Sequence, residues 1–338
     1  MIKEAIMKLV SGESLSFNDA FGAMENIMNG DATEAQIGAF ITALRIKGET
    51  DEEIAGLASV MRAKATPVNV SGRTIDVVGT GGDGSNSFNI STAAAFVAAG
   101  AGLKVAKHGN RAASSWCGSA DILEALGVKI ELGPEEVAEC IEKAGIGFMF
   151  APMYHPAMKY AASPRKEIGI RTVFNILGPL TNPAKAEHIV LGVPSQELGT
   201  KITTVLYRLG TKHSLVVHSQ EGMDELSISG SSYMWEITEK EVSSPCEVKP
   251  KDFGLQSADA ISMKGSSPKE NAAMLHRIFD GEKGALRDVV VMNAAAALVA
   301  GDIVKDLKQA ARLSEEIIDS GKAKEKLNML VEISQRLG

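Results

Sequence analysis

The sequence predicts an α/β protein: a small N-terminal helical domain, then a larger α/β domain with a mostly parallel central sheet flanked by helices. Three observations support this fold class. Residues 1–66 have the periodicity of short helices, whereas short β-branched runs alternate with helical runs from residue 74 onwards. Such alternation favours a parallel sheet. A chain of 338 residues, 45% of them hydrophobic, can also bury enough apolar surface for two domains.

The N-terminal helices are predicted from their start and stop signals. Thr33-x-x-Gln36 and Thr50-x-x-Glu53 have the form of capping boxes, and each precedes an apolar-periodic run. Gly30 and Gly48 stand where helix C-caps are expected, and Pro67 ends the last helix. No group of residues suited to catalysis occurs in this region, so we expect it to serve as scaffold or subunit contact.

Six strands and several helices are predicted in the second region. The strand-like runs are "TIDVV" (74–78), "LKVAKH" (103–108), "GVKIEL" (127–132), "GIGFMFA" (145–151), "HIVLGV" (188–193) and "HSLVVH" (213–218). Helices are expected at 134–144 and 196–209, and a helical pair at 305–336. The segment 171–184 has little strand character. We therefore expect a helical domain at 1–70, joined by about 171–187, and an α/β domain at 71–338.

Composition excludes several classes of protein. The net charge of −7 argues against a general nucleic-acid binder. No apolar run reaches the roughly 20 residues of a membrane span, and residues 1–16 have a helix pattern rather than that of a secretory signal. The three cysteines are odd in number and too scattered for a zinc site, which favours a cytoplasmic location.

A glycine-rich loop follows the first predicted strand, in "DVVGTGGDGSNSFNIST" (76–92). Gly79-x-Gly81-x-x-Gly84 formally matches a dinucleotide fingerprint, but the following helix opens only near Ser91. Lys107 stands where an acidic residue should contact the ribose. No Gly-Lys-Ser/Thr follows either. The loop is therefore interpreted as a different kind of anion site, in which backbone N–H groups approach the ligand.

A second anion site is predicted from residues around the next strand end. Its candidate donors are Lys107, Arg111, Ser114, Ser115 and Ser119, and a helix N-terminus adds Asn89, Ser91 and Thr92. Ser119 alone would equally suit a helix cap. Two anion sites at neighbouring strand ends suit a substrate that carries phosphate groups at both ends.

Two adjacent carboxylates complete the candidate site. Asp224 and Glu225 lie in "HSQEGMDELSIS" (218–229), just after a predicted strand. Such a pair is often only a solvated loop. Beside two phosphate sites it is better interpreted as a magnesium site, since Mg²⁺ takes one or two carboxylates together with phosphate oxygens.

Together these motifs resemble a known family. "GTGGD" (79–83), "NIST" (89–92), "KHGNRAASS" (107–115), "GSADILEALG" (118–127), "MDELS" (223–227) and "NAAAALVAG" (293–301) are similar to the anthranilate phosphoribosyltransferases of tryptophan biosynthesis. The resemblance extends to the end of the chain, with the motifs in the expected order. Trp116 departs from it, because a polar or basic residue is more usual there.

The resemblance implies a nucleoside phosphorylase/phosphoribosyltransferase-like fold, with the active site between the two domains and a homodimer formed through the helical domains. It implies transfer of ribose 5-phosphate from phosphoribosyl pyrophosphate to the amine of anthranilate, with Mg²⁺ as cofactor. No catalytic nucleophile is expected. The acceptor arginine is expected to be Arg165 in "APMYHPAMKYAASPRKEIG" (151–169), although a surface salt bridge with Glu167 or another acid is the alternative.

The resemblance also assigns site residues. For phosphoribosyl pyrophosphate they are Gly79, Gly82, Asp83, Ser87, Asn89, Ile90, Ser91, Thr92, Lys107, Ser115 and Ser119. For anthranilate they are Gly79, His108, Asn110, Pro152, His155, Arg165 and Gly178. The metal ligands are Ser91, Asp224 and Glu225.

Two other functions fit parts of the pattern. A pyrimidine nucleoside phosphorylase-like enzyme would bind free phosphate and a nucleoside, and would lack the acidic metal pair. A non-catalytic relative that binds nucleic acid would be hard to reconcile with the acidic charge of the chain.

Overall fold

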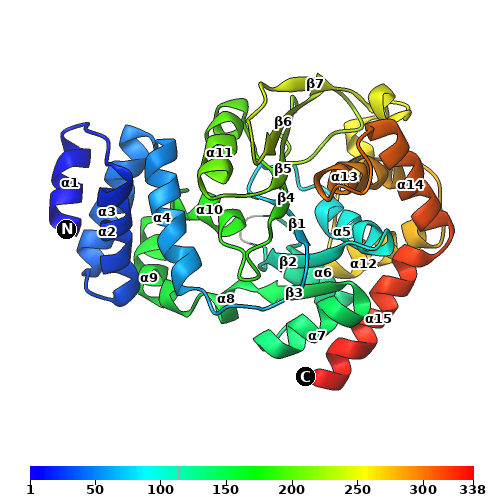
Figure 1. Cartoon of the computed structure of the whole chain (residues 1–338), viewed down its shortest axis with the longest axis horizontal. Helices are drawn as coiled ribbons and strands as arrows, with labels where there is room; N and C mark the ends of the chain where they lie inside the picture. The colour runs from blue at the N-terminus through cyan, green and yellow to red at the C-terminus, as the bar shows by residue number, and fades with distance from the viewer. Residues whose placement is uncertain (113–114) are drawn as a thin grey trace.

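A computed structural model describes residues 1–112 and 115–338. It places a bundle of helices beside a larger α/β unit, with the N-terminus in the bundle and the C-terminus on the α/β unit (Figure 1). The bundle consists of α1 (Ile2–Val10), α2 (Phe17–Asn29), α3 (Glu34–Lys47) and α4 (Asp51–Lys64). The capping boxes at Thr33 and Thr50 are both formed, and Gly30 caps α2 in the left-handed conformation.

The α/β unit is built on a seven-stranded sheet of order β3-β2-β1-β4-β5-β6-β7. Its strands are β1 (Thr74–Gly79), β2 (Lys104–Gly109), β3 (Ile146–Phe150), β4 (His188–Gly192), β5 (His213–Ser219), β6 (Ser232–Thr238) and β7 (Cys246–Val248). Strands β1 to β5 are parallel, while β6 and β7 are antiparallel additions at one edge. The predicted fold class, an α/β chain with a mostly parallel sheet, is confirmed.

Helices cover both faces of this sheet (Figure 1). The longer ones are α5 (Ile90–Gly100), α7 (Pro134–Ala144), α11 (Gln196–Arg208), α12 (Pro268–Phe279), α13 (Ala285–Ala300), α14 (Leu307–Asp319) and α15 (Lys322–Leu337). The shorter ones are α6 (Ser119–Ala125), α8 (Ala151–Tyr154), α9 (Lys159–Ile168), α10 (Phe174–Leu177), η1 (Pro156–Met158), η2 (Gly178–Leu180), η3 (Pro250–Phe253) and η4 (Ala260–Met263).

Two hydrophobic cores lie on opposite faces of the sheet. On β4, Val190 packs with α5 and α13, whereas Ile189 and Leu191 pack with α11 and the helical bundle. This alternation follows from the pleat of a strand, in which successive side chains point to opposite faces. The second core also contains Val173, Phe174, Leu177 and Leu180, so this later segment packs with α1–α4.

The predicted strand at 127–132 is wrong, because these residues do not pair with the sheet. The alternating side chains of Val128, Ile130 and Leu132 are buried as a strand pattern requires. The backbone bonds to side chains instead: Lys129 N–H donates to Ser334 Oγ (3.0 Å), and the Tyr154 hydroxyl donates to the Leu132 carbonyl (2.7 Å). The antiparallel strands β6 and β7 were not predicted.

The strand order places a topological switch point between β1 and β4. The chain leaves β1 for α5 on one face and leaves β4 for α11 on the other, so the two connections diverge. Ligands of open α/β sheets bind at the carboxyl ends of strands at such a point. Gly79 and Gly192 are the paired last residues of these two strands. Across the described chain, no helix is long and apolar enough to cross a membrane.

Candidate functional site

The backbone around Asp224 lies directly over the switch point. The segment after β5 turns back, with Ser219 N–H donating to the Met223 carbonyl (3.1 Å) and Met223 N–H to Ser219 Oγ (3.0 Å). It comes so close to the end of β4 that a Cβ atom at Gly192 would overlap the Asp224 carbonyl group. Glycine is required there because any side chain would displace the acidic segment.

Three acidic residues meet at this point. The Asp224 carboxylate accepts a hydrogen bond from Gly81 N–H (2.6 Å) in the glycine loop, and Glu225 accepts one from Ser91 N–H (3.2 Å) at the start of α5. Asp224 N–H in turn donates to Asp83 Oδ2 (3.3 Å). The structure therefore joins the glycine loop, the N-terminus of α5 and the acidic pair in one cluster, as the sequence predicts.

Burial and repulsion between neighbouring carboxylates disfavour the charged forms of Asp224 and Glu225. Burial first, and then the neighbouring charge of Asp83, raise the pKa of Asp224 to about 7. Burial is also the main reason why the pKa of Glu225 lies well above its usual value, and the negative charge of Asp224 is the second reason. A divalent cation would reverse this effect by supplying the missing positive charge. The donor set is carboxylate oxygen, which suits Mg²⁺.

Lys107 lies beneath the acidic cluster and is 2% exposed. Its ammonium donates to the Val77 carbonyl (2.6 Å) in β1, and burial lowers its pKa, while Asp76 and Glu225 raise it. Asp76 is held in turn by Asn182, whose amide donates to its carboxylate (2.7 Å). Burial raises the pKa of Asp76 to about 6 despite the opposing charge of Lys107. Asp76 and Asn182 were not among the predicted site residues.

Arg171, between α9 and α10, holds the outer side of the glycine loop. Its guanidinium donates to the carbonyls of Gly81 (2.9 Å) and Gly82 (2.8 Å). Gly82 has φ +67°, and a Cβ atom there would overlap the Arg171 guanidinium. On the other side of the loop, Gly81 N–H donates to the Asp224 carboxylate, so the loop is held from both sides. Sequence analysis missed Arg171 because nothing in the local sequence indicates a contact 89 or 90 residues away.

Several residues of the predicted second anion site form hydrogen bonds or ion pairs with other residues of the protein. The Asn89 amide donates to the Cys117 carbonyl (3.0 Å), and Ser119 Oγ donates to the Asn110 carbonyl (3.3 Å). Arg111 forms ion pairs with Asp121 and Glu124 rather than pointing into the site. Ser115 is exposed, and Ser114 lies outside the described residues.

Three further predicted residues contribute in different ways. The Thr92 hydroxyl is buried and has no hydrogen-bond partner within the described chain. The Ile90 side chain belongs to the hydrophobic core, so only its backbone can face a ligand. Ser87 pairs with Lys264 in an isolated bridge beside the glycine loop.

Two of the predicted acceptor residues are buried histidines that lie next to each other. The rings of His108, at the end of β2, and His155, after α8, lie 5.0 Å apart between centroids. Burial lowers their pKa values to about 3 and about 4, so both imidazoles are neutral. Each Nε2 atom is buried without a partner among the described residues. Gly178 lies on this side of the site, since its backbone interacts with His108.

Arg165, on α9, does not form the alternative salt bridge with Glu167. Its guanidinium lies 5.1 Å from the centroid of the Phe174 ring, and Glu167 accepts instead from Ser163 Oγ (2.7 Å). Burial lowers the pKa of Arg165. Asn110 and Pro152 are exposed. An arginine that is partly desolvated and not paired with Glu167 is suited to bind an external carboxylate.

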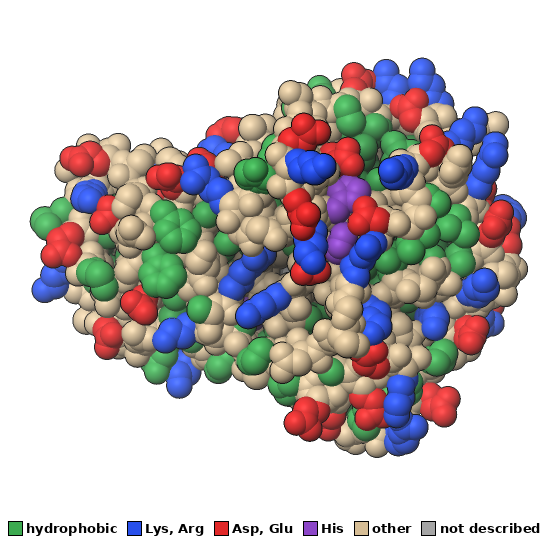
Figure 2. Space-filling model, in the orientation of Figure 1, with side chains coloured by type: hydrophobic (Ala, Val, Ile, Leu, Met, Phe, Trp, Pro, Cys, Tyr) green, Lys and Arg blue, Asp and Glu red, His purple; other side chains and the backbone are tan. Residues whose placement is uncertain are grey.

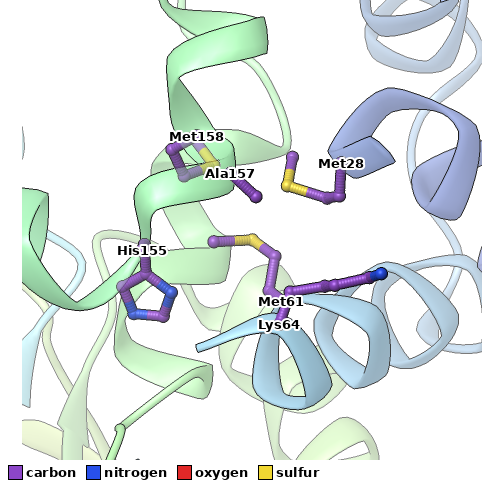
Figure 3. Close-up of a pocket in the computed structure, with 6 residues that line it drawn as sticks. All are labelled: Met28, Met61, Lys64, His155, Ala157 and Met158. Carbon is purple, nitrogen blue, oxygen red and sulfur yellow. The ribbon is translucent and has the colours of Figure 1, made fainter. Parts of the chain in front are cut away.

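A small methionine-lined recess lies behind His155 (Figure 3). It is lined by Met28, Met61, Lys64, His155, Ala157 and Met158. In Figure 3 the side chains of Met28 and Met61 point towards the segment 155–158. These side chains leave essentially no room for even a water molecule, so the recess does not accommodate a substrate.

The class of protein follows from this combination of fold and site. Residues 3–65 match the family described as "Glycosyl transferase family, helical bundle domain", and residues 71–324 match "Glycosyl transferase family, a/b domain". The chain is thus a member of this glycosyl transferase family, with the acidic cluster and glycine loop at its switch point.

Individual relatives indicate which enzymes of this glycosyl transferase family the chain is most similar to. A Dehalococcoides mccartyi protein named anthranilate phosphoribosyltransferase is 57% identical to this chain, and the match covers 100% of this chain and 99% of that protein. A Chloroflexus aggregans protein of the same name is 56% identical, and the match covers 99% of this chain and 98% of that protein. The Thermus thermophilus enzyme structure has a TM-score of 0.93 at 44% identity, covering 98% of this chain and 99% of that one. The structure of anthranilate phosphoribosyltransferase from Saccharomyces cerevisiae, in complex with PRPP and Mg, has a TM-score of 0.91 at 30% identity. The match covers 99% of this chain and 98% of that one. This chain belongs to the anthranilate phosphoribosyltransferase family.

The raised carboxylate pKa values predict a stability effect of Asp224→Asn. The folded protein holds these protons more tightly than the unfolded chain, so metal-free stability falls as pH rises from about 4 through about 7. We expect Asp224→Asn to raise the metal-free Tm at pH 8 by about 2–4 °C, with little change at pH 4, and to reduce stabilisation by excess Mg²⁺.

Thermal scans of the metal-free and Mg²⁺-loaded proteins at both pH values measure this effect. Glu221→Gln, on the same segment but outside the cluster, is the matched control and should behave as the wild type. Equal Mg²⁺ stabilisation in Asp224→Asn and wild type would contradict the assignment.

Proposed function

We propose that this chain transfers the 5-phosphoribosyl group from phosphoribosyl pyrophosphate to the amine of anthranilate, giving N-(5-phosphoribosyl)anthranilate and pyrophosphate. The observation that carries the proposal is the contact of Asp224 and Glu225 with the glycine loop and the N-terminus of α5. This arrangement puts metal ligands beside two sets of backbone N–H groups, as a substrate with phosphates at both ends requires.

The donor substrate lies over the ends of β1 and β2 in this proposal. Gly79, Gly82 and Asp83 face the pyrophosphate, and Lys107 supplies positive charge from beneath. The phosphoribosyl group is bound by Ser87, Asn89, Ile90, Ser91, Thr92, Ser115 and Ser119. The unpartnered Thr92 hydroxyl supports this assignment, because a buried hydroxyl without a bond needs a ligand or water.

Mg²⁺ would be held by Ser91, Asp224 and Glu225. The fit rests on Asp224 and Glu225, two adjacent carboxylates whose charged forms are disfavoured without a cation. When bound, Mg²⁺ neutralises charge that develops on the departing pyrophosphate. The glycine-loop N–H groups and the α5 N-terminus stabilise the same negative charge and are already positioned before the reaction.

Anthranilate binds on the side of His108 and His155 in this proposal, with Asn110 in contact with it, Gly79 and Pro152 nearby, and Gly178 at the pocket edge. Neutral imidazoles suit an aromatic ring and an uncharged amine, since they place no positive charge beside the nucleophilic nitrogen. Arg165 would pair with the anthranilate carboxylate. No covalent nucleophile is assigned, and positioning of the amine against the anomeric carbon carries much of the rate.

The domain division and assembly are part of the same proposal. Residues 1–70, joined by about 171–187, form the helical domain, and 71–338 form the α/β domain. The packing of Val173, Phe174, Leu177 and Leu180 against α1–α4 supports the join. We also propose a cytoplasmic location, for which the three free cysteines are support.

A fluorescence assay tests the function. Anthranilate fluorescence should disappear only when the chain, phosphoribosyl pyrophosphate and Mg²⁺ are all present. The alternative of a pyrimidine nucleoside phosphorylase predicts release of uracil from uridine and phosphate, and the nucleic-acid-binding alternative predicts stabilisation by an oligonucleotide. Either result, with no loss of anthranilate, would overturn the proposal.

Arg165→Ala should weaken anthranilate use much more than phosphoribosyl pyrophosphate use. Loss of one partner of a desolvated charge pair costs about 2–5 kcal/mol, which is roughly 30-fold or more in the anthranilate KM. Arg165→Lys should recover only part of this loss, because an ammonium lacks the planar fork of arginine. Steady-state kinetics with each substrate varied measure both effects, with Lys166→Ala as control. A change confined to phosphoribosyl pyrophosphate would move Arg165 to the donor site.

Arg171→Ala should weaken the use of phosphoribosyl pyrophosphate more than that of anthranilate, the reverse of the effect expected for Arg165→Ala. Loss of its two bonds to the glycine loop frees the Gly81 and Gly82 carbonyls, and we expect the phosphoribosyl pyrophosphate KM to rise about tenfold. The anthranilate KM should change little. Arg171→Lys can bond one carbonyl but does not reproduce the planar pair, so it should be intermediate. Unchanged donor kinetics in Arg171→Ala would show that the loop does not depend on this contact.

The homodimer is expected to use the exposed apolar side chains of the bundle. Met7 and Val10 on α1 are 62% and 73% exposed, and Ile46 on α3 is 81% exposed. Met7→Asp combined with Val10→Asp should convert a dimer into monomers by sedimentation velocity. Ile261→Asp is the matched control, since this residue is 73% exposed on η4 of the α/β unit. A dimer that persists in the double variant would place the interface elsewhere.

A further inference from the structure

A cluster of two histidines and one aspartate lies at the amino-terminal ends of β4 and β5, whereas the substrate site lies at the carboxyl ends of the strands. His188 and His213 are the first residues of β4 and β5 and face each other in register. Asp302 follows α13 and completes the cluster. Strand β5 has seven residues, so this edge lies about 20 Å from the acidic cluster at the other end. Figure 2 shows histidine side chains reaching the surface of this face, with acidic and basic side chains around them.

The Asp302 carboxylate lies between the two imidazoles. Its Oδ1 is 2.6 Å from His213 Nδ1, and its Oδ2 is 3.9 Å from His188 Nδ1. One donor atom from each of the three side chains lies within 4.8 Å of the other two. Donor atoms around zinc are roughly 3.3 Å apart, so the 2.6 Å contact between His213 and Asp302 would have to widen slightly to admit an ion.

Both rings are oriented by further contacts, as metal-binding histidines usually are. His188 Nδ1–H donates to the Ala300 carbonyl (2.7 Å), which leaves Nε2 of His188 as its ligand atom, and His213 Nε2 lies 2.9 Å from Glu236 Oε1, which leaves Nδ1 of His213. His213 thus has a carboxylate at each ring nitrogen, Asp302 at Nδ1 and Glu236 at Nε2. A metal ion bound by Nδ1 and Asp302 would leave the Nε2–H group to donate to Glu236.

The backbone of Asp302 adopts φ +55°, in the left-handed region. This conformation costs roughly 1 kcal/mol for a residue with a side chain, although aspartate tolerates it better than most. Arg73 partly neutralises the carboxylate, with Nη1 3.2 Å from Oδ2. The Arg73 side chain is 49% exposed and can turn into solvent, which would leave Asp302 to a different cation.

We propose that His188, His213 and Asp302 form a binding site for Zn²⁺, or for Co²⁺ or Ni²⁺ in its place. Two imidazoles and one carboxylate are ligands that these borderline ions prefer, whereas Mg²⁺ prefers oxygen alone. The fourth position is left to water. The ion connects the first residues of β4 and β5 to the loop between α13 and α14 and so stabilises this end of the sheet.

Cobalt binding tests the site. The chain is saturated with Mg²⁺ to occupy the oxygen ligands of Asp224 and Glu225, and Co²⁺ is then titrated. We expect visible absorption bands of tetrahedral Co²⁺ at one ion per chain, which Zn²⁺ removes. Saturating Zn²⁺ should raise the Tm by about 3–6 °C. Turnover of the Mg²⁺-loaded enzyme should not change.

Variants identify the ligands. His213→Gln should lose the cobalt bands and the zinc stabilisation, while His276→Gln, an exposed histidine on α12, should keep both. Arg73→Ala should tighten Co²⁺ binding several-fold, because it removes a competing positive charge. Asp302→Asn serves as second ligand variant where circular dichroism shows that His213→Gln is misfolded. Absence of the bands in the wild type, or their persistence in the ligand variants, overturns the proposal.

Discussion

The close approach of Asp224 to the ends of β1 and β4 is the constraint on which the rest of the site depends. It requires glycine at the end of β4, where a side chain would overlap the acidic segment. It also lets the Asp224 carboxylate bind Gly81 N–H directly, which orders the glycine loop before any substrate arrives. The same approach excludes water from the acids, and this burial raises their pKa values.

The site therefore reduces the stability of the metal-free fold. The buried Asp224 is repelled by the half-buried Glu225 and Asp83, and the positive charge of Lys107 opposes the negative charge of Glu225. Lys107 is itself buried and depends on Asp76 and Val77. Such a preorganised, destabilised cluster favours cation binding, because the cation relieves repulsion that the fold already maintains.

The two sides of the site are connected through the segment that runs from α9 to η2. Arg165 lies over the Phe174 ring, Gly178 interacts with His108, and Arg171 reaches across to the glycine loop. Because Val173, Phe174 and Leu177 also pack in the core of the helical bundle, this segment links the bundle to His108 and to the glycine loop. A shift of the bundle would consequently move residues on both sides.

The sequence by itself determined the fold class, the capping boxes and the grouping of the glycine loop with Asp224 and Glu225. Each depends on local periodicity, on turn chemistry or on the rule that parallel strands end at one edge. Tertiary structure decided the rest. The pattern of 127–132 predicts a strand, but Ser334 and Tyr154 bind its backbone instead of a neighbouring strand. Arg171, Asn182 and the His188–His213–Asp302 cluster have no local signal, since their partners are about 25 to more than 100 residues away in the chain and only folding brings them together.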